Sequence, residues 1–260
     1  MNDCSDKIVL ITGATSGIGH ATACAFARRG ASVVVAARSP IAGSSVVEEL
    51  NELGSDARFI RTDVTNESDV AAMVDFSLTE FGRLDYAFNN AGIFVAEPQF
   101  HEHDSDTWHE IISTNLTSVY LCMKYEMAAM LESRKDSPEA AVIINNASII
   151  GHRGSSASGL AYATAKHGVI GLTRQAAVNY ANRNIRVNAV SPGPTLTAAT
   201  RPNLTVPEDE LKTRLAALNP TAELVPVDDI AETVVFLCSS AASMINGHDI
   251  PLDGGQLAKL

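Results

Sequence analysis

Short runs rich in Val, Ile and Ala alternate with longer amphipathic runs along the whole chain, and no Pro-, Gly- or Ser-rich linker divides it. The short runs are nearly continuous in aliphatic residues, which is typical of parallel strands covered by helices on both faces. They predict strands at residues 8–12, 32–37, 57–61, 84–88, 141–145, 185–190 and 249–252, with helices beginning near residues 17, 39, 66, 105, 160 and 227. This alternation predicts one α/β domain over residues 1–260, with a doubly wound parallel sheet and a ligand crevice at the carboxyl ends of its strands.

The charge balance excludes some kinds of partner. The 260 residues include 19 Lys plus Arg and 30 Asp plus Glu, a formal net charge of −11, and no run of basic residues. Nucleic acids and anionic membranes require clustered positive charge, so we expect neither as a partner. The first residues lack the pattern of a secretory signal, and the most apolar late segment is too short for a membrane span, so a cytoplasmic protein is expected.

A glycine-rich turn, T-G-A-T-S-G-I-G at residues 12–19, follows the first predicted strand and runs into a helix. Gly13, Gly17 and Gly19 allow a tight turn and close backbone approach, and the free N–H groups of the helix start attract a pyrophosphate. The turn predicts a dinucleotide cofactor, with an ordinary strand-to-helix loop as the alternative.

The residue after the second predicted strand bears on which cofactor is used. Sites that prefer NAD carry an acid about 20 residues past the glycines, where it binds the ribose 2′-hydroxyl, whereas an Arg accommodates a 2′-phosphate. This chain has Ala37 and Arg38 at that point, so NADP(H) is predicted over NAD(H). The alternative is that Arg38 is solvated and either cofactor is used.

Two further turns supply candidate cofactor contacts. Asp63 and Val64 follow the third predicted strand, where Asp63 either accepts from the adenine amino group or caps the next helix. Asn90, Ala91 and Gly92 follow the fourth strand and bring small residues and amides to the centre of the crevice.

Tyr162 and Lys166 lie four residues apart on one predicted helix face. A Tyr pKa near 10 must fall by roughly three units, about 4 kcal/mol, for acid/base work near neutrality. A cation about 4 Å away supplies that order of energy at an effective dielectric of about 20. Tyr162 could then protonate the carbonyl oxygen of a substrate. Ser148, at the exit of the fifth strand, can polarise the same carbonyl. Tyr120 and Lys124 have the same spacing, but lie far down a long helix and should sit away from the crevice.

The chain resembles the short-chain dehydrogenase/reductase family over nearly its whole length. The matching features are T-G-x-x-x-G-x-G at 12–19, Asp63-Val64, N-N-A-G at 89–92, Asn115, Ser148, Tyr162 with Lys166, I-R-V-N at 185–188 leading to Pro192-Gly193, and the ending at 246–255. The resemblance implies a Rossmann-type fold of about seven strands in the order 3-2-1-4-5-6-7.

The resemblance also implies roles for individual residues. Tyr162 would be the proton donor and acceptor, Ser148 would orient the substrate oxygen, Lys166 would bind the nicotinamide ribose, and Asn115 would hold a water that links Lys166 to solvent. The predicted cofactor contacts are Gly13, Ser16, Gly17, Ile18, Gly19, Arg38, Asp63, Val64, Asn90, Ala91, Gly92, Tyr162, Lys166, Pro192, Gly193, Thr195 and Thr197.

One departure concerns the catalytic serine. Ser148 lies 14 residues before Tyr162, one more than is usual in the family, and the loop at 151–159 is expected to absorb the difference. Ser155, Ser156 and Ser158 in that loop compete for the role, but the motif around Ser148 matches better.

Other features are expected to have ordinary structural roles. His101, His103 and His109 are expected in a solvated loop and helix start rather than a metal site. The four cysteines show neither metal-ligand nor disulfide spacing, so reduced thiols and no metal are predicted. Arg153 either meets an anionic substrate or is a surface residue. Residues 195–225 are predicted to form a mobile flap over the substrate, with an ordinary surface excursion as the alternative.

Together these features predict an NADP(H)-dependent oxidoreductase. It would interconvert a carbonyl, of ketone or 3-oxoacyl type, and a secondary alcohol by direct hydride transfer with Tyr162 as acid/base. An NAD-dependent alcohol, sugar or polyol dehydrogenase and a non-catalytic nucleotide-binding sensor are the alternatives. Small residues on the helix at 160–181 favour a homodimer or homotetramer built on that helix and the one after Ser105, unless they serve packing within the chain.

Overall fold

A seven-stranded parallel sheet forms the centre of the computed structural model, with the strand order β3-β2-β1-β4-β5-β6-β7. The structure describes residues 4–95, 97–135, 137–155, 158–198, 200–201 and 206–259. The strands are β1 (Ile8–Thr12), β2 (Ser32–Ala37), β3 (Ala57–Arg61), β4 (Tyr86–Asn89), β5 (Ala141–Asn146), β6 (Ile185–Pro192) and β7 (Asp249–Leu252). The predicted fold class and strand order are confirmed.

Four strands have the predicted bounds, and three differ at their ends. β4 is assigned from Tyr86 rather than residue 84, because the Leu84 N–H donates to the Ser133 hydroxyl instead of joining the ladder. β5 is one residue longer than predicted. β6 runs two residues further because Ser191 and Pro192 pair with β7.

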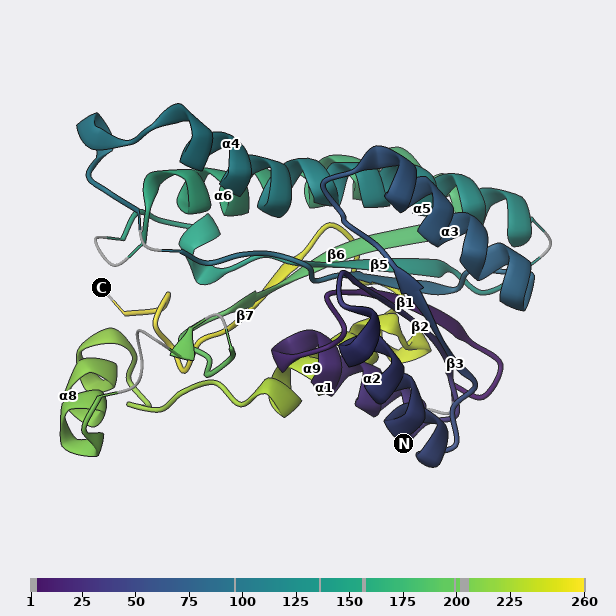
Figure 1. Cartoon of the computed structure of the whole chain (residues 1–260), viewed down its shortest axis with the longest axis horizontal. Helices are drawn as coiled ribbons and strands as arrows, with labels where there is room; N and C mark the ends of the chain where they lie inside the picture. Colours follow the sequence, from purple (N-terminus) through teal and green to yellow (C-terminus); the bar gives the residue numbers. More distant parts are fainter. Residues whose placement is uncertain are drawn as a thin grey trace.

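Helices cover both faces of the sheet (Figure 1). α1 (Gly17–Ala27), α2 (Pro40–Glu52) and α9 (Val227–Cys238) lie on one face, and α3 (Glu67–Phe81), α4 (Ser105–Ile112), α5 (Ser118–Ser133) and α6 (Leu160–Tyr180) lie on the other. α8 (Glu208–Leu218) stands apart from both layers. Short 3-10 turns occur at Phe100–Glu102, Ile149–Gly151, Ala181–Arg183 and Ser240–Ala242, and a π-helical turn at Ser113–Thr117. Within the described ranges, no helix combines the length and apolar character needed to cross a bilayer.

Alternate residues of each strand enter two separate cores. In β1, Val9 and Ile11 pack into the core beneath α1, α2 and α9, while Leu10 packs into the core beneath α3, α5 and α6. This explains the nearly continuous aliphatic runs, since both faces of every central strand are buried. All four cysteines are buried thiols, as predicted.

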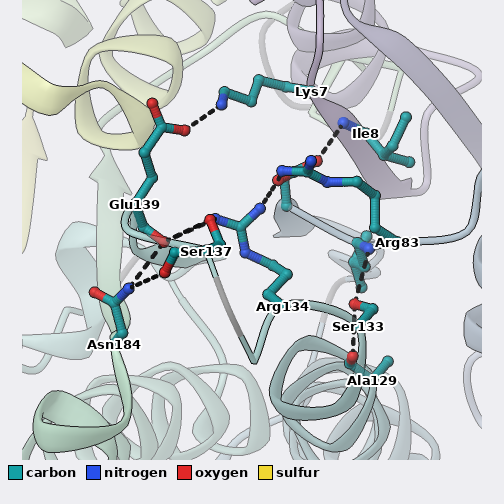
Figure 2. A network of polar contacts seen from close by, with 11 residues as sticks. Lys7, Ile8, Arg83, Ala129, Ser133, Arg134, Ser137, Glu139 and Asn184 are labelled. Atoms are coloured by element: carbon teal, nitrogen blue, oxygen red, sulfur yellow. Dashed lines mark hydrogen bonds and ion pairs between the residues drawn. The ribbon is translucent and has the colours of Figure 1, made fainter.

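A network of charges lies at the amino ends of the central strands (Figure 2). The fully buried Asp85 carboxylate accepts from the Ile8 N–H at 2.9 Å and forms ion pairs with Arg83 and Arg134. Arg134 also donates to the Glu139 carbonyl oxygen at 2.8 Å. The network joins β1 to the segments before β4 and before β5.

Candidate active site

A cleft of about 1540 Å³ opens at the carboxyl ends of the strands. It is lined by the four predicted catalytic residues, Asn115, Ser148, Tyr162 and Lys166, and by every predicted cofactor contact except Gly19. Single-ligand pockets measure about 300–1,000 Å³, so this cleft has room for a dinucleotide together with a substrate.

The glycine-rich turn adopts the backbone conformation that its glycines were expected to permit. Gly13 and Gly17 have φ values of +65° and +55°, in the left-handed region that favours glycine. Gly19 serves packing instead, because an added Cβ would lie 2.4 Å from the Gly13 carbonyl oxygen. Ser16 makes no side-chain cap, and no acid lies in the first turn of α1. The helix start therefore fits an anionic group such as a pyrophosphate.

Arg38 lies at the adenosine end of the predicted site. It is exposed, lines the cleft immediately after β2, and forms no ion pair with any described side chain. Asp63 does not cap α3, whose N-cap is Asn66. Its Oδ1 accepts from the N–H and hydroxyl of Thr65, at 3.0 and 2.7 Å, and these bonds are the main cause of its lowered pKa. The capping alternative for Asp63 is therefore wrong.

A chain of amides connects the strand ends to Lys166. The Asn90 side chain donates to the Thr12 carbonyl oxygen at 3.1 Å and accepts from the Asn146 side chain at 2.9 Å. The Lys166 ammonium donates to the Asn146 carbonyl oxygen at 2.6 Å. The sequence motifs at 12–19 and 89–92 thus hold the lysine through β1, β4 and β5, and Asn146 is a link that the sequence did not single out.

Tyr162 is fixed on three sides. The Ser148 side chain lies near enough to its hydroxyl to lower its pKa, and the Lys166 Nζ lies 5.6 Å from the centre of its ring. The Phe94 ring meets the Tyr162 ring edge to face, with centroids 5.0 Å apart. Of the serines considered for the catalytic role, Ser148 is thus the one whose side chain affects the Tyr162 hydroxyl. Ser155 and Ser158 line the same cleft, and Ser156 lies outside the described residues.

Burial shifts the pKa values of this pair away from the expected direction. It raises the pKa of Tyr162 to about 12, and the hydrogen bond with Ser148 offsets this only in part. Burial also lowers the pKa of Lys166 to about 8. The protein alone therefore favours a protonated phenol near neutral pH.

Asn115 lies on the π-helical turn that interrupts the expected long helix after Ser105. Its Oδ1 accepts from the Ile93 N–H at 3.0 Å, and its Nδ2 donates to the Ile93 carbonyl oxygen at 3.1 Å. π turns occur frequently at functional sites, since they change the local aim of the helix. Here the turn brings the buried Asn115 side chain against the loop that precedes Phe94.

Glu97 is a site residue that the sequence did not indicate. Its carboxylate, 0% exposed, accepts from the N–H groups of Ala161 and Tyr162 at 2.7 and 3.1 Å. The N-cap residue of α6 is Gly159, which has no side chain to do this. Glu97 therefore caps the helix that carries the catalytic tyrosine, in a position that the helix dipole favours.

His103 supports the same carboxylate. Its Nε2 lies 2.8 Å from Glu97 and its Nδ1 lies 3.0 Å from the Asp104 carbonyl oxygen. Both partners are acceptors, so only the imidazolium form can donate to both, and the bond to Glu97 is the main cause of its raised pKa. The expected solvated position is wrong for His103, whose side chain is 4% exposed. It holds for His101 and His109, which are exposed.

The second Tyr and Lys pair lies outside the cleft, as predicted. Tyr120 is 50% exposed, and Lys124 donates to the Glu67 carboxylate at 2.7 Å. Neither lines the cleft.

Apolar residues also line the cleft, and one of them, Phe94, contacts the Tyr162 ring. They come from the loop after β4, the turn after β5 and α8, and include Phe94, Ile150, Leu211, Leu215 and Leu218. α8 belongs to the predicted flap at 195–225, of which residues 199 and 202–205 lie outside the described part of the chain. Arg153 donates to the Gln256 carbonyl oxygen at 2.8 Å and does not line the cleft.

Comparisons with known proteins agree with this geometry. A family model described as Enoyl-(Acyl carrier protein) reductase matches residues 13–256. The chain is 39% identical to the cis-4-hydroxycyclohexanecarboxylate dehydrogenase of Sinomonas cyclohexanicum, over 98% of each protein. It is 37% identical to the cyclohexanol dehydrogenase of Acinetobacter sp. (strain SE19), over 99% of this chain and 98% of that one. The crystal structure of levodione reductase superposes with a TM-score of 0.90 at 33% identity, covering 98% of this chain and 99% of that one.

Proposed function

Because the chain belongs to the short-chain dehydrogenase/reductase family, and the two dehydrogenases named above act on CH–OH groups, we propose that it interconverts a cyclic ketone and its secondary alcohol with NADP(H). The observation that carries the proposal is that Ser148, Tyr162 and the buried Lys166 line one large cleft, with Lys166 beside the Tyr162 ring and Ser148 near its hydroxyl.

The residues of the cleft divide the work of the reaction. The cofactor, when bound, supplies or accepts the hydride. In reduction, the Ser148 hydroxyl donates to the substrate oxygen, and the Tyr162 Oη delivers the proton that completes the alcohol. Burial holds this proton on the phenol near neutral pH, so the proton-donating form of Tyr162 is present there. In oxidation Tyr162 must first lose the proton, and the Lys166 ammonium stabilises the phenolate that remains.

The preference for NADP(H) rests on Arg38. It is exposed at the edge of the cleft and forms no ion pair with a described side chain, so its guanidinium is available to a 2′-phosphate. If the enzyme is instead NAD-linked, substitution of Arg38 should leave its cofactor preference unchanged.

The ring-shaped substrate class is suggested by two kinds of observation. The names of two relatives specify alcohols on six-membered carbon rings. The cleft beside Tyr162 is lined by aromatic and aliphatic side chains, including Phe94, Ile150 and Leu215, which suit a compact apolar ring. The flap that carries α8 is proposed to close over this ring.

A homodimer or homotetramer is also proposed. Within the chain, Gly168 packs on Leu116, so part of the small-residue stripe on α6 is already used. Val178 and Tyr120, on the outer faces of α6 and α5, are exposed and remain for a second copy. Sedimentation at micromolar concentration tests this, and a monomer would contradict it. We retain the expectation of a cytoplasmic protein, which cell fractionation would check.

The deciding experiment follows oxidation of NADPH and of NADH with a panel of carbonyl compounds. The panel contains substituted cyclohexanones, a linear ketone, a 3-oxoacyl ester, an aldose, a quinone and an enoyl thioester. We expect turnover of the cyclohexanones with NADPH, and a loss of the NADPH preference in Arg38→Ala. Preference for the enoyl thioester would overturn the substrate class, an unchanged NADPH preference in Arg38→Ala would remove Arg38 from cofactor choice, and tight NADPH binding without turnover would favour a sensor.

A further inference from the structure

Three side chains of metal-ligand type converge outside the active site. His20 and Cys24 lie four residues apart on one face of α1, and Glu49 reaches them from α2. The His20 Nε2 lies 2.8 Å from Glu49 Oε2, and the Cys24 Sγ lies 3.7 Å from His20 Nε2 and 3.6 Å from Glu49 Oε1. Among the described residues, this is the one group of three His, Cys, Asp or Glu side chains whose ligand atoms all lie within 4.8 Å of one another.

These separations are close to those of a tetrahedral zinc site. With Zn–S near 2.3 Å and Zn–N or Zn–O near 2.0–2.1 Å, neighbouring ligand atoms lie about 3.3–3.6 Å apart. The two contacts of the Cys24 sulfur therefore need almost no adjustment. The His20 contact is with the other Glu49 oxygen, Oε2, so binding through a single oxygen requires the carboxylate to turn, starting from ligand atoms that lie within 4.8 Å of one another. The side chains of His20 and Glu49 are 32% and 48% exposed, so they have room to move.

The charges also suit a divalent cation. A thiolate and a carboxylate together carry the two negative charges that balance such an ion, with a neutral imidazole as third ligand. Without an ion, burial and the neighbouring Glu49 raise the pKa of Cys24 to about 11, and Asp228 acts in the same direction while Arg28 opposes them. The thiol therefore holds a proton that the ion must displace.

The cluster is open to solvent. A pocket of about 350 Å³ is lined by His20, Cys24 and Glu49 together with Asp228 from α9, and the Arg28 and Arg201 side chains line it as well. It provides an entry path for an ion and room for a fourth ligand, either a water or the Asp228 carboxylate.

We propose that His20, Cys24 and Glu49 form a zinc site that joins α1 to α2. The site lies outside the catalytic residues, so hydride transfer does not depend on it. Its pocket shares Ser16 and Gly17 with the predicted cofactor cleft, and α2 begins two residues after Arg38. A bound ion would therefore brace the two helices that carry the predicted pyrophosphate and 2′-phosphate contacts.

Cobalt(II) is the spectroscopic probe, added to the purified full-length protein. We expect one equivalent to bind, with visible d–d bands of a tetrahedral site and a near-ultraviolet band from the Cys24 thiolate, and we expect Zn²⁺ to displace it. Cys24→Ser should lose the near-ultraviolet band, and His20→Ala should weaken binding at least tenfold. His101→Ala, which removes an exposed histidine elsewhere, is the matched control and should bind like the parent protein.

Thermal unfolding gives a second readout that does not depend on activity. Added Zn²⁺ should raise the Tm of the parent protein and of His101→Ala, but not of Cys24→Ser or His20→Ala, whose folding is checked by circular dichroism without metal. Absence of a one-to-one cobalt complex in the parent protein would overturn the proposal, as would a thiolate band that persists in Cys24→Ser.

Discussion

Buried charged groups at the two ends of the central strands differ in their surroundings. At the amino ends, the Asp85 carboxylate is surrounded by Arg83, Arg134 and the Ile8 N–H, so its partners all come from the chain. At the carboxyl ends, Lys166 is also buried and Tyr162 is half-buried, yet both line the cleft. Charge at the first end therefore serves the fold, whereas charge at the second end is held ready for a ligand. Mutations at the amino ends should therefore lower the stability of the protein, whereas mutations at the carboxyl ends should lower its activity.

The largest effect is expected for Tyr162→Phe. Removing the hydroxyl takes away the proposed proton donor, so kcat should fall about 10²- to 10⁴-fold while the protein stays folded. The measurement is steady-state reduction of the best ketone from the panel, with thermal unfolding alongside. Tyr120→Phe is the matched control, and an inactive Tyr120→Phe beside an active Tyr162→Phe would show that the wrong tyrosine was assigned.

Asp85→Ala should have the converse effect. It leaves Arg134 buried without its partner, which typically costs about 3–5 kcal/mol of unfolding free energy. The folded fraction should keep the kcat of the parent protein, since Asp85 does not line the cleft. Urea unfolding and specific activity measure the two quantities. Glu67→Gln, which breaks the exposed pair with Lys124, should change neither. A stable but inactive Asp85→Ala would contradict the division between the two ends.

Glu97→Ala tests whether the cap of α6 positions Tyr162. Misplacing a catalytic group by about 1 Å can cost 10²-fold in rate, so we expect kcat to fall about ten- to a hundredfold with little change in the cofactor KM.

Gly159 offers a rescue of that variant. Its backbone, with φ −77° and ψ 165°, accepts any residue, and Asp is a preferred N-cap. The Cβ that remains in Glu97→Ala would still lie 2.4 Å from a Cβ at residue 159, so the rescue uses glycine at position 97. Glu97→Gly combined with Gly159→Asp should therefore recover most of the kcat that Glu97→Gly loses. Gly159→Asp alone should be harmful, because its Cβ would lie 1.9 Å from the Glu97 Cδ. If the double variant is folded and as slow as Glu97→Gly, capping is not how Glu97 acts.

The smallest effect concerns pH. The pKa of Lys166 is lowered to about 8, whereas that of Tyr162 is raised to about 12. The kcat/KM for reduction should therefore be level near neutrality and fall above pH 8 as the ammonium is lost, by about tenfold per pH unit at most. Initial rates in a constant-ionic-strength buffer series measure this. A profile that stays level to pH 10 would mean that the charge of Lys166 is not needed.

The sequence predicted the sheet and most of the cleft because these depend on local patterns. Aliphatic runs located the strands within two residues, and the motifs around Gly13, Asn90 and Tyr162 follow strands that end at one edge of the sheet. The π turn at Asn115 was missed because nothing in the residue types at 113–117 distinguishes it from ordinary helix.

Contacts between segments remote in sequence were also missed. Glu97 lies 65 residues before the Tyr162 N–H that it accepts from, and Glu49 lies 29 residues after His20. No periodicity relates such pairs. The one available signal was a helix at 160 preceded by Gly159, whose N-cap position lacks a polar side chain and so requires a cap from elsewhere.

The capping of α6 by Glu97 limits how this enzyme can be re-engineered. The loop after β4 supplies Phe94 to the substrate side of the cleft, so it is an obvious segment to exchange when a new specificity is wanted. The same loop holds the start of the helix that carries Tyr162. A grafted loop without an acid at position 97 would alter specificity and slow the chemistry together, unless the same design placed Asp at residue 159 and Gly at residue 97.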